Sequence, residues 1–345
     1  MAYTTINKPT DYFETVTYSG NGTGQDITTL DFQPDWLWIK RRDSVGSHRI
    51  QDSIRGTTNY LQSDKTDTEA SGGDVDAFLS NGFSLSGGST AYNVSGGTYV
   101  GWSWLGGGTA SSNTDGSITS SVSANTTAGF SIVSWVGNAT GSATIGHGLG
   151  VKPKVFFCKN RTDADSWVNW QDTTNDGTAD VRMNLNQTAA DRNDNFITFG
   201  TSTITLPSTS DNGWNGSSDN MIAYCFAEKK GYSKFGSYTG TGVDAGPFSY
   251  CGFKPSFVLI KRTDSSGSWV IQDNKRPGYN ETSLDLNPNN SEAEETNNGI
   301  DMLSNGFKQR NTDAHTNASG GTYIYMAFAE SPFVTSGTKA AGTAR

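Results

Sequence analysis

Charged residues, cysteines and helix-forming runs are all scarce in this sequence. Only 17% of its 345 residues are charged, and the formal net charge is -9. No cluster of Lys and Arg is present, which argues against sequence-independent binding of nucleic acid, because such binding depends on clustered cations. Cys158, Cys225 and Cys251 form no CxxC pair, and we expect them to be reduced thiols in the core.

Long apolar runs are missing as well. No stretch approaches the roughly 20 apolar residues of a membrane-spanning helix, and the opening Met-Ala-Tyr-Thr-Thr-Ile-Asn-Lys-Pro has no apolar signal-peptide core. We therefore expect a soluble chain without a membrane span, made in a cytoplasm. Glycine (41 residues) and aromatics (11%) are plentiful, and good helix formers never recur at helical spacing. The sequence predicts an all-β protein of short strands joined by tight turns.

Three segments of the chain repeat the same order of landmarks. Each begins with a proline, four apolar residues within the next five positions, and a lysine, at 34–40, 153–159 and 255–261. Four consecutive apolar residues leave neither face of a strand for water, which predicts a central strand buried on both sides. A second strand then ends in Gln-Asp, and each copy closes with an aromatic strand. Several strands in each copy, with heavily apolar first and last strands, favour a two-sheet antiparallel sandwich of jelly-roll type.

The repeats divide the chain into six parts. We expect an N-terminal arm, a first β-sandwich module, a low-complexity linker, two further β-sandwich modules and a C-terminal tail, at 1–17, 18–105, 106–128, 129–235, 236–333 and 334–345. The linker is rich in Gly, Ser and Thr and is predicted to be extended. The connector 229–236 is short and aromatic, so we expect the second and third modules to form one rigid unit while the first hangs on its linker.

The most conspicuous polar residues recur in every copy. They are three lysines and three aspartates, Lys40, Lys159 and Lys261 with Asp52, Asp172 and Asp273. A catalytic site is needed once, whereas these residues recur with the scaffold, so we interpret them as structural ion pairs or turn bonds. The second copy departs from the pattern. It lacks Ser-Asn-Gly-Phe and the arginine that follows Gln-Asp as Arg55 and Arg276 in the other copies.

One segment offers hard oxygen ligands. Asp172, Asp176 and Asp180 surround a glycine and form a weak candidate calcium site. Their spacing differs from that of an EF-hand, and runs of Asp, Asn, Gly and Thr are ordinary turn sequences. We therefore predict no metal centre and no cofactor.

Aromatic residues in loops are the candidate ligand contacts. Trp214, Tyr92 and Tyr279 lie among turn residues, where an aromatic ring can stack on a sugar. No nucleophile elbow and no paired carboxylates stand out. A polysaccharide depolymerase is thus the weakest hypothesis, and we predict a protein that is not an enzyme.

Four stretches resemble a known repeat family. They are the opening nine residues, the strand Pro-Asp-Trp-Leu-Trp-Ile-Lys, the linker Ser-Ser-Asn-Thr-Asp-Gly-Ser-Ile-Thr-Ser and the junction Gly-Tyr-Ser-Lys-Phe-Gly-Ser-Tyr-Thr-Gly. Together they resemble β-sandwich repeats, concanavalin-like or jelly-roll, of virion appendage proteins in marine tailed phages. The resemblance covers nearly the whole chain and brings no catalytic or ligand motif.

The resemblance implies a structural protein of a tailed-phage virion. We expect a tail fibre or tail appendage, assembled in the host cytoplasm, that binds other virion proteins through the N-terminal arm. By analogy with phage appendages the chain would be a homotrimer. A capsid decoration protein and a glycan-binding module for host attachment remain the alternatives.

Overall fold

The computed structural model describes residues 3–277 and 279–334 and is almost entirely β. Its helices within these ranges are a short 3-10 helix, η1 (Pro9–Asp11), and a single turn, α1 (Asn212–Asn215). The strands form six sheets with antiparallel neighbours, so the predicted all-β class is confirmed. In the ranges described, no helix has the length and apolar character needed to cross a membrane.

The first segment forms a five-stranded sheet of order β1-β8-β3-β4-β5 and a three-stranded sheet of order β2-β7-β6. Its strands are β1 (Phe13–Ser19), β2 (Gln25–Ile27), β3 (Trp36–Arg41), β4 (Arg49–Asp52), β5 (Gly56–Leu61), β6 (Val75–Leu79), β7 (Gly82–Leu85) and β8 (Thr98–Trp104). The apolar run of β3 is buried on both faces. Leu37 and Ile39 pack between the two sheets, whereas Trp36 and Trp38 face a second core shared with the rest of the chain.

The second segment forms a seven-stranded sheet of order β15-β14-β13-β18-β11-β10-β9 and a three-stranded sheet of order β12-β17-β16. Its strands are β9 (Ser111–Asn113), β10 (Ser120–Asn125), β11 (Phe130–Val136), β12 (Thr144–Gly146), β13 (Val155–Asn160), β14 (Val168–Gln171), β15 (Val181–Asn184), β16 (Thr198–Phe199), β17 (Thr203–Thr205) and β18 (Asn220–Phe226).

The expectation of an extended linker over 106–128 is wrong. β9 and β10 lie within it and continue the large sheet of the second segment, with Val122 of β10 directly opposite Val133 of β11. An edge strand pairs through its backbone and needs few apolar side chains, so a serine-rich sequence can form one. Composition alone therefore mistook a sheet edge for a linker.

The third segment repeats the pattern with a four-stranded sheet of order β19-β26-β21-β22 and a four-stranded sheet of order β20-β25-β24-β23. Its strands are β19 (Ser233–Thr239), β20 (Phe248–Tyr250), β21 (Phe253–Arg262), β22 (Val270–Asp273), β23 (Thr282–Asp285), β24 (Glu295–Leu303), β25 (Gly306–Gln309) and β26 (Thr322–Pro332). In each segment the closing strand lies between two strands of the same large sheet. β8 lies between β1 and β3, β18 between β11 and β13, and β26 between β19 and β21, and the second strand of each pair carries the recurring lysine.

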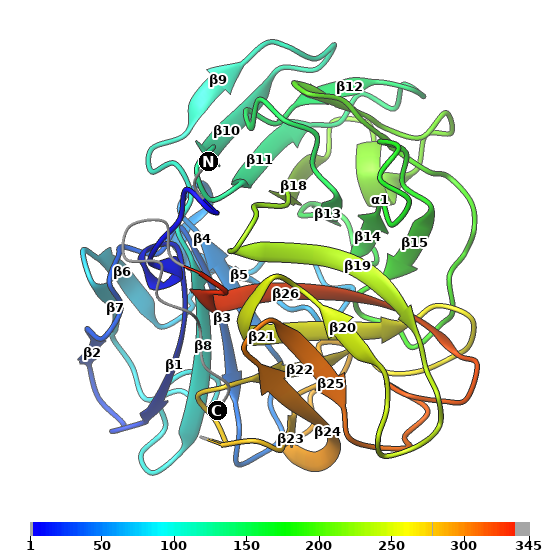
Figure 1. Ribbon diagram of the computed structural model, residues 1–345. Coiled ribbons are helices and arrows are strands. Elements are labelled where there is room, and N and C mark those ends of the chain that lie inside the picture. The colour runs from blue at the N-terminus through cyan, green and yellow to red at the C-terminus, as the bar shows by residue number, and fades with distance from the viewer. Residues whose placement is uncertain (1–2, 278, 335–345) are drawn as a thin grey trace.

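The three large sheets surround one central core (Figure 1). Trp104, Phe226 and Phe328 hold equivalent positions on β8, β18 and β26, and their rings form a triangle. The ring centroids lie 6.4 Å apart between Trp104 and Phe226, 5.5 Å between Trp104 and Phe328, and 5.9 Å between Phe226 and Phe328. The segments thus form a closed ring with pseudo-threefold arrangement. The expectation that the first copy hangs freely while the other two form a unit is wrong, because all three bury side chains in the same core.

The N-terminal arm lies against the body of the protein. Ile6 is part of the central core, and the Thr4 hydroxyl donates a hydrogen bond of 2.6 Å to the carbonyl of Lys230. The ring of Tyr12 packs edge-on against that of Tyr232. The arm therefore fixes the first segment to the connector between the other two. The predicted C-terminal tail falls almost wholly on residues 335–345, outside the described ranges.

Candidate functional site

Each recurring lysine is fully buried and binds the segment next to it. Lys159 donates to the carbonyl of Thr66 (3.2 Å), Lys40 to that of Ser291 (3.4 Å), and Lys261 to those of Thr188 (3.3 Å) and Ala189 (3.0 Å). Burial lowers the pKa of Lys40 and Lys159 to about 8 and that of Lys261 to about 7. The residues are structural, as interpreted from the sequence, but their partners are carbonyls rather than the recurring aspartates.

These contacts define three equivalent joints between segments. Each joint is named by the segment that supplies the lysine-bearing hairpin, followed by the segment that supplies the loop. In joint 2–1 the β13–β14 hairpin meets the loop 62–69. In joint 1–3 the β3–β4 hairpin meets the loop 287–294. In joint 3–2 the β21–β22 hairpin meets the loop 184–191. A ring nitrogen spans each joint, since Trp167 donates to Gln62 O (2.8 Å), His48 lies 3.1 Å from Asn287 O, and Trp269 donates to Asn184 O (3.0 Å).

Joint 2–1 contains a row of four charged side chains, of which the inner two are fully buried and the outer two are partly exposed. Asp52 accepts a hydrogen bond of 2.5 Å from Arg55, Arg55 lies 3.1 Å from Glu69, and Glu69 lies 2.8 Å from Arg161 of the second segment. The side chains of Asp52 and Arg55 are fully buried. Tyr224, also of the second segment, donates its hydroxyl to Asp52 at 2.7 Å. Both carboxylates of this row, Asp52 and Glu69, therefore have an arginine beside them, as buried charges require.

Joint 1–3 repeats this arrangement. Arg276 donates to Asp273 at 2.7 Å and lies 2.9 Å from Glu294, which in turn lies 2.8 Å from Arg42 of the first segment. Trp102 takes the place of the tyrosine and donates its ring nitrogen to Asp273 at 3.0 Å.

Joint 3–2 lacks the charged chain. Asp172 accepts hydrogen bonds from the backbone of Asn175 and Gly177 in its own turn instead of from an arginine. Asp191 and Thr263 occupy the places of the glutamate and the outer arginine and meet only through the backbone, at 2.8 Å. The missing arginine of the second copy, noticed in the sequence, is thus one part of a joint that dispenses with all its ion pairs among the described residues.

The candidate calcium ligands point into turns rather than toward a common centre. Asp176 accepts from the backbone of Thr178, and Asp180 accepts from both the backbone and the hydroxyl of Thr173. In the described part of the chain, no three side chains of the types that bind metals cluster together. The aspartates therefore act as turn residues in this structure.

The structure corrects two of the three aromatic candidates. Trp214 and Tyr92 are each only 2% exposed. Trp214 donates to Thr209 O (3.0 Å) and packs edge-on against Trp170, while Tyr92 lies between the sheets of the first segment. A ring covered on both faces cannot stack on a ligand. Tyr279 is 80% exposed and stays a candidate.

Two exposed rings were missed in the sequence. Phe248 and Tyr250 on β20 are 45% and 57% exposed, with Ser249 between them turned inward. The alternation of large and small residues along Pro-Phe-Ser-Tyr-Cys predicts a strand with two different faces, but the usual pattern would turn the large rings toward the core.

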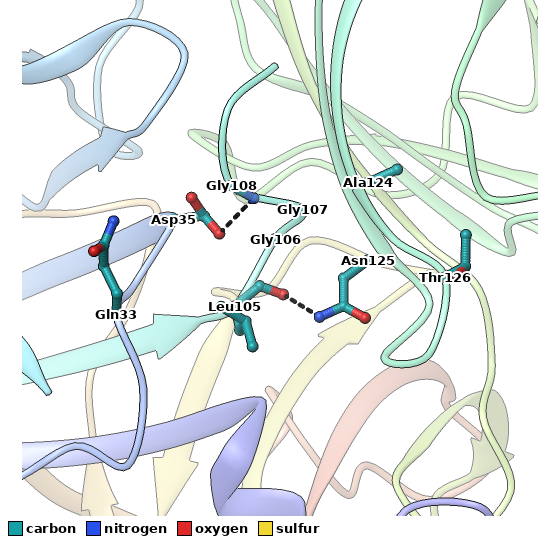
Figure 2. A pocket seen from close by; sticks show the side chains of 9 residues that line it. All are labelled: Gln33, Asp35, Leu105, Gly106, Gly107, Gly108, Ala124, Asn125 and Thr126. Atoms are coloured by element: carbon teal, nitrogen blue, oxygen red, sulfur yellow. Dashed lines mark hydrogen bonds between the residues drawn. The ribbon is translucent and has the colours of Figure 1, made fainter. Parts of the chain in front are cut away.

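A hollow of about 440 Å³ opens between the first and second segments (Figure 2). Three consecutive glycines, 106–108, form part of its lining, and Asp35 is the carboxylate among the lining residues. The side chain of Asp35 accepts a hydrogen bond of 3.2 Å from the backbone of Gly108, and burial raises the pKa of its carboxyl. The corresponding place in the second segment holds an ion pair, with Lys154 3.3 Å from Glu228. The hollow thus marks a place where the first copy has no such pair.

Comparison with known proteins places the chain in a family without assigning it an activity. No curated protein matches the sequence. One family model matches residues 8–332, a range that includes the strands of all three segments. The chain belongs to the family described as Domain of unknown function (DUF7483).

Proposed function

We propose that this chain is a non-enzymatic structural protein of a tailed-phage virion, placed in a tail appendage such as a fibre. The observation that carries the proposal is the use made of the recurring polar residues. Lys40, Lys159 and Lys261, whose pKa values are lowered by burial, bind carbonyls between segments. Polar chemistry that an enzyme would present in a cleft is here used to hold three copies together.

Two further features favour the proposal. Residues in four stretches resemble repeats of phage appendage proteins, and the closed ring resists deformation because its segments share one core. A rigid body of this kind suits a particle that must survive outside a cell.

The proposal includes docking to other virion proteins through the N-terminal arm and assembly as a homotrimer. Because Ile6 is buried in the central core, docking through the arm uses the side chains that stay exposed, such as Lys8. A homotrimer stays a prediction, and light scattering of the purified chain tests it. One chain already brings three similar sheets around an axis, so a monomer would also present threefold pseudosymmetry.

Purified particles test the proposal. Mass spectrometry of virions should find the chain in many copies, and antibody labelling under the electron microscope should place it on the tail. Labelling of the capsid would favour the decoration alternative over the fibre. If the chain is absent from intact particles although it is present in the infected cell, the structural role is overturned.

A further inference from the structure

The third segment differs from the other two in what it shows to solvent. The exposed large apolar side chains of the described residues include three aromatic rings, those of Phe248, Tyr250 and Tyr279, and all three belong to this segment. Among the described residues of the other two segments, the exposed large apolar side chains are valines, Val45, Val136 and Val151.

Phe248 and Tyr250 are held in place on the outer face of the β20-β25-β24-β23 sheet. A methyl group added to Gly306 would lie 2.9 Å from Phe248 Cζ, so the phenyl ring lies against the glycine and turns its other face to solvent. Tyr250 reaches its hydroxyl toward Gly252 and the hydroxyl of Tyr3. Burial and a hydrogen bond with Tyr250 raise the pKa of Tyr3 to about 12. Both rings are thus preorganised rather than free to rotate.

Charged side chains continue the same face beside the rings. Lys308 of β25 lies directly opposite Phe248, and Asp301 of β24 lies directly opposite Lys308. Arg310 follows, 3.5 Å from Asp301 and 3.8 Å from Glu281. Donors and acceptors therefore lie next to an apolar ring face, the combination that recognises a ligand with both characters.

The equivalent positions of the other copies carry no rings. Strand register places Asp26 and Thr28 of the first segment where the third has Phe248 and Tyr250, and the glycine beneath is kept as Gly82. In the second segment the same positions are Thr144 and Gly146. The scaffold does not need aromatic residues here, because two of its three copies fold without them.

We propose that this face of the third segment binds polysaccharide by stacking the apolar faces of pyranose units on Phe248 and Tyr250. A protein partner fits less well. An aromatic side chain has about 150–250 Å² of surface, so the two partly exposed rings offer roughly 200 Å² where a stable protein interface buries about 800 Å² on each side. A sugar needs only a ring face with hydrogen-bonding groups around it.

Binding of three soluble polymers to the full-length chain tests this site: a neutral β-glucan, an alginate and a purified bacterial lipopolysaccharide. Calorimetry should detect binding of at least one of them. Phe248→Ala and Tyr250→Ala should each weaken it about tenfold, the loss expected for one stacked ring. Val136→Ala and Val151→Ala remove exposed apolar side chains from the second segment and should leave binding unchanged.

A graft gives an independent test. Asp26→Phe combined with Thr28→Tyr should create a second site above Gly82 and double the binding stoichiometry. The proposal fails if none of the polymers binds, or if the alanine variants bind them as the natural chain does. It also fails if the alanine substitutions abolish self-association of the protein rather than polysaccharide binding. Because the site does not depend on a place in the virion, its failure and that of the structural role are separate outcomes.

Discussion

Joints 2–1 and 1–3 each contain a chain of ion pairs whose inner pair is buried and whose outer pair crosses the joint, whereas joint 3–2 has no such ion pair among the described residues. All three share the lysine and the ring nitrogen that bind carbonyls across the joint. The backbone contacts are therefore the common mechanism, and the charged chain is an addition.

The members of the charged chain are absent together. Joint 3–2 has Met326 where the others place Tyr224 or Trp102 against the aspartate, and Thr263 where they place an arginine. Loss of one member alone would leave a buried charge without a partner, which costs several kcal/mol. The comparison teaches that such a network is gained or lost as a unit.

The largest effect is expected from breaking a network at its centre. Arg55→Met and Arg276→Met each leave a buried aspartate without its cation, and each should lower the free energy of unfolding by about 3–5 kcal/mol. Urea denaturation followed by tryptophan fluorescence measures this. Arg262→Met is the matched control, because Arg262 pairs with the more exposed Asp264 and should cost less than about 1 kcal/mol. Equal losses in all three variants would contradict the distinction between a buried ion pair and a partly exposed one.

A smaller effect is expected from the pH dependence of joint 3–2. The pKa of Lys261 is about 7 in the folded protein, below the value near 10.4 in an unfolded chain. Between these values the unfolded state binds more protons, so stability should rise with pH above about 7. The three buried cysteines, whose pKa values burial raises, oppose this above about pH 8.5.

Lys261→Met isolates the contribution of this lysine. The variant retains the cysteines and also Lys40 and Lys159, whose pKa values of about 8 act in the same direction as that of Lys261. From pH 7 to 8.5 its stability should therefore rise less steeply than that of the natural chain, by about 1 kcal/mol per pH unit. Parallel curves would mean that Lys261 keeps its proton in the joint.

The smallest effect is expected from rebuilding part of the network. Thr263→Arg combined with Asp191→Glu restores the outer pair of joint 3–2 without an inner arginine beside Asp172. The new pair lies toward solvent, so the free energy of unfolding measured by urea denaturation should change by less than about 1 kcal/mol in either direction. A large gain would show that the outer pair alone is stabilising.

Much of the fold was predictable because each copy repeats strong local signals. The four-residue apolar runs became β3, β13 and β21, since a strand buried on both faces has no polar side. The ring was not predictable. Burial on the second face of these strands was assigned to a sandwich within each copy, whereas Trp36 and its equivalents pack against the other segments.

The candidate ligand site was predicted less well. Trp214 stands between Asn and Gly residues that predict a loop, yet it lies on the turn α1 and packs in the core beside Trp170, because burial of so large an apolar ring is strongly favourable. An aromatic residue that alternates with small residues is expected in the core, so the exposure of Phe248 and Tyr250 is visible only in the structure.

The triangle formed by Trp104, Phe226 and Phe328 fixes the number of repeats. In an open solenoid, copies can be added or deleted because each contacts only its neighbours. Here a fourth copy would find no place at the axis, and removal of one would uncover the aromatic core of the remaining two. Duplication of the module can therefore proceed to three and then stop, and divergence of single copies becomes the remaining route to new surfaces.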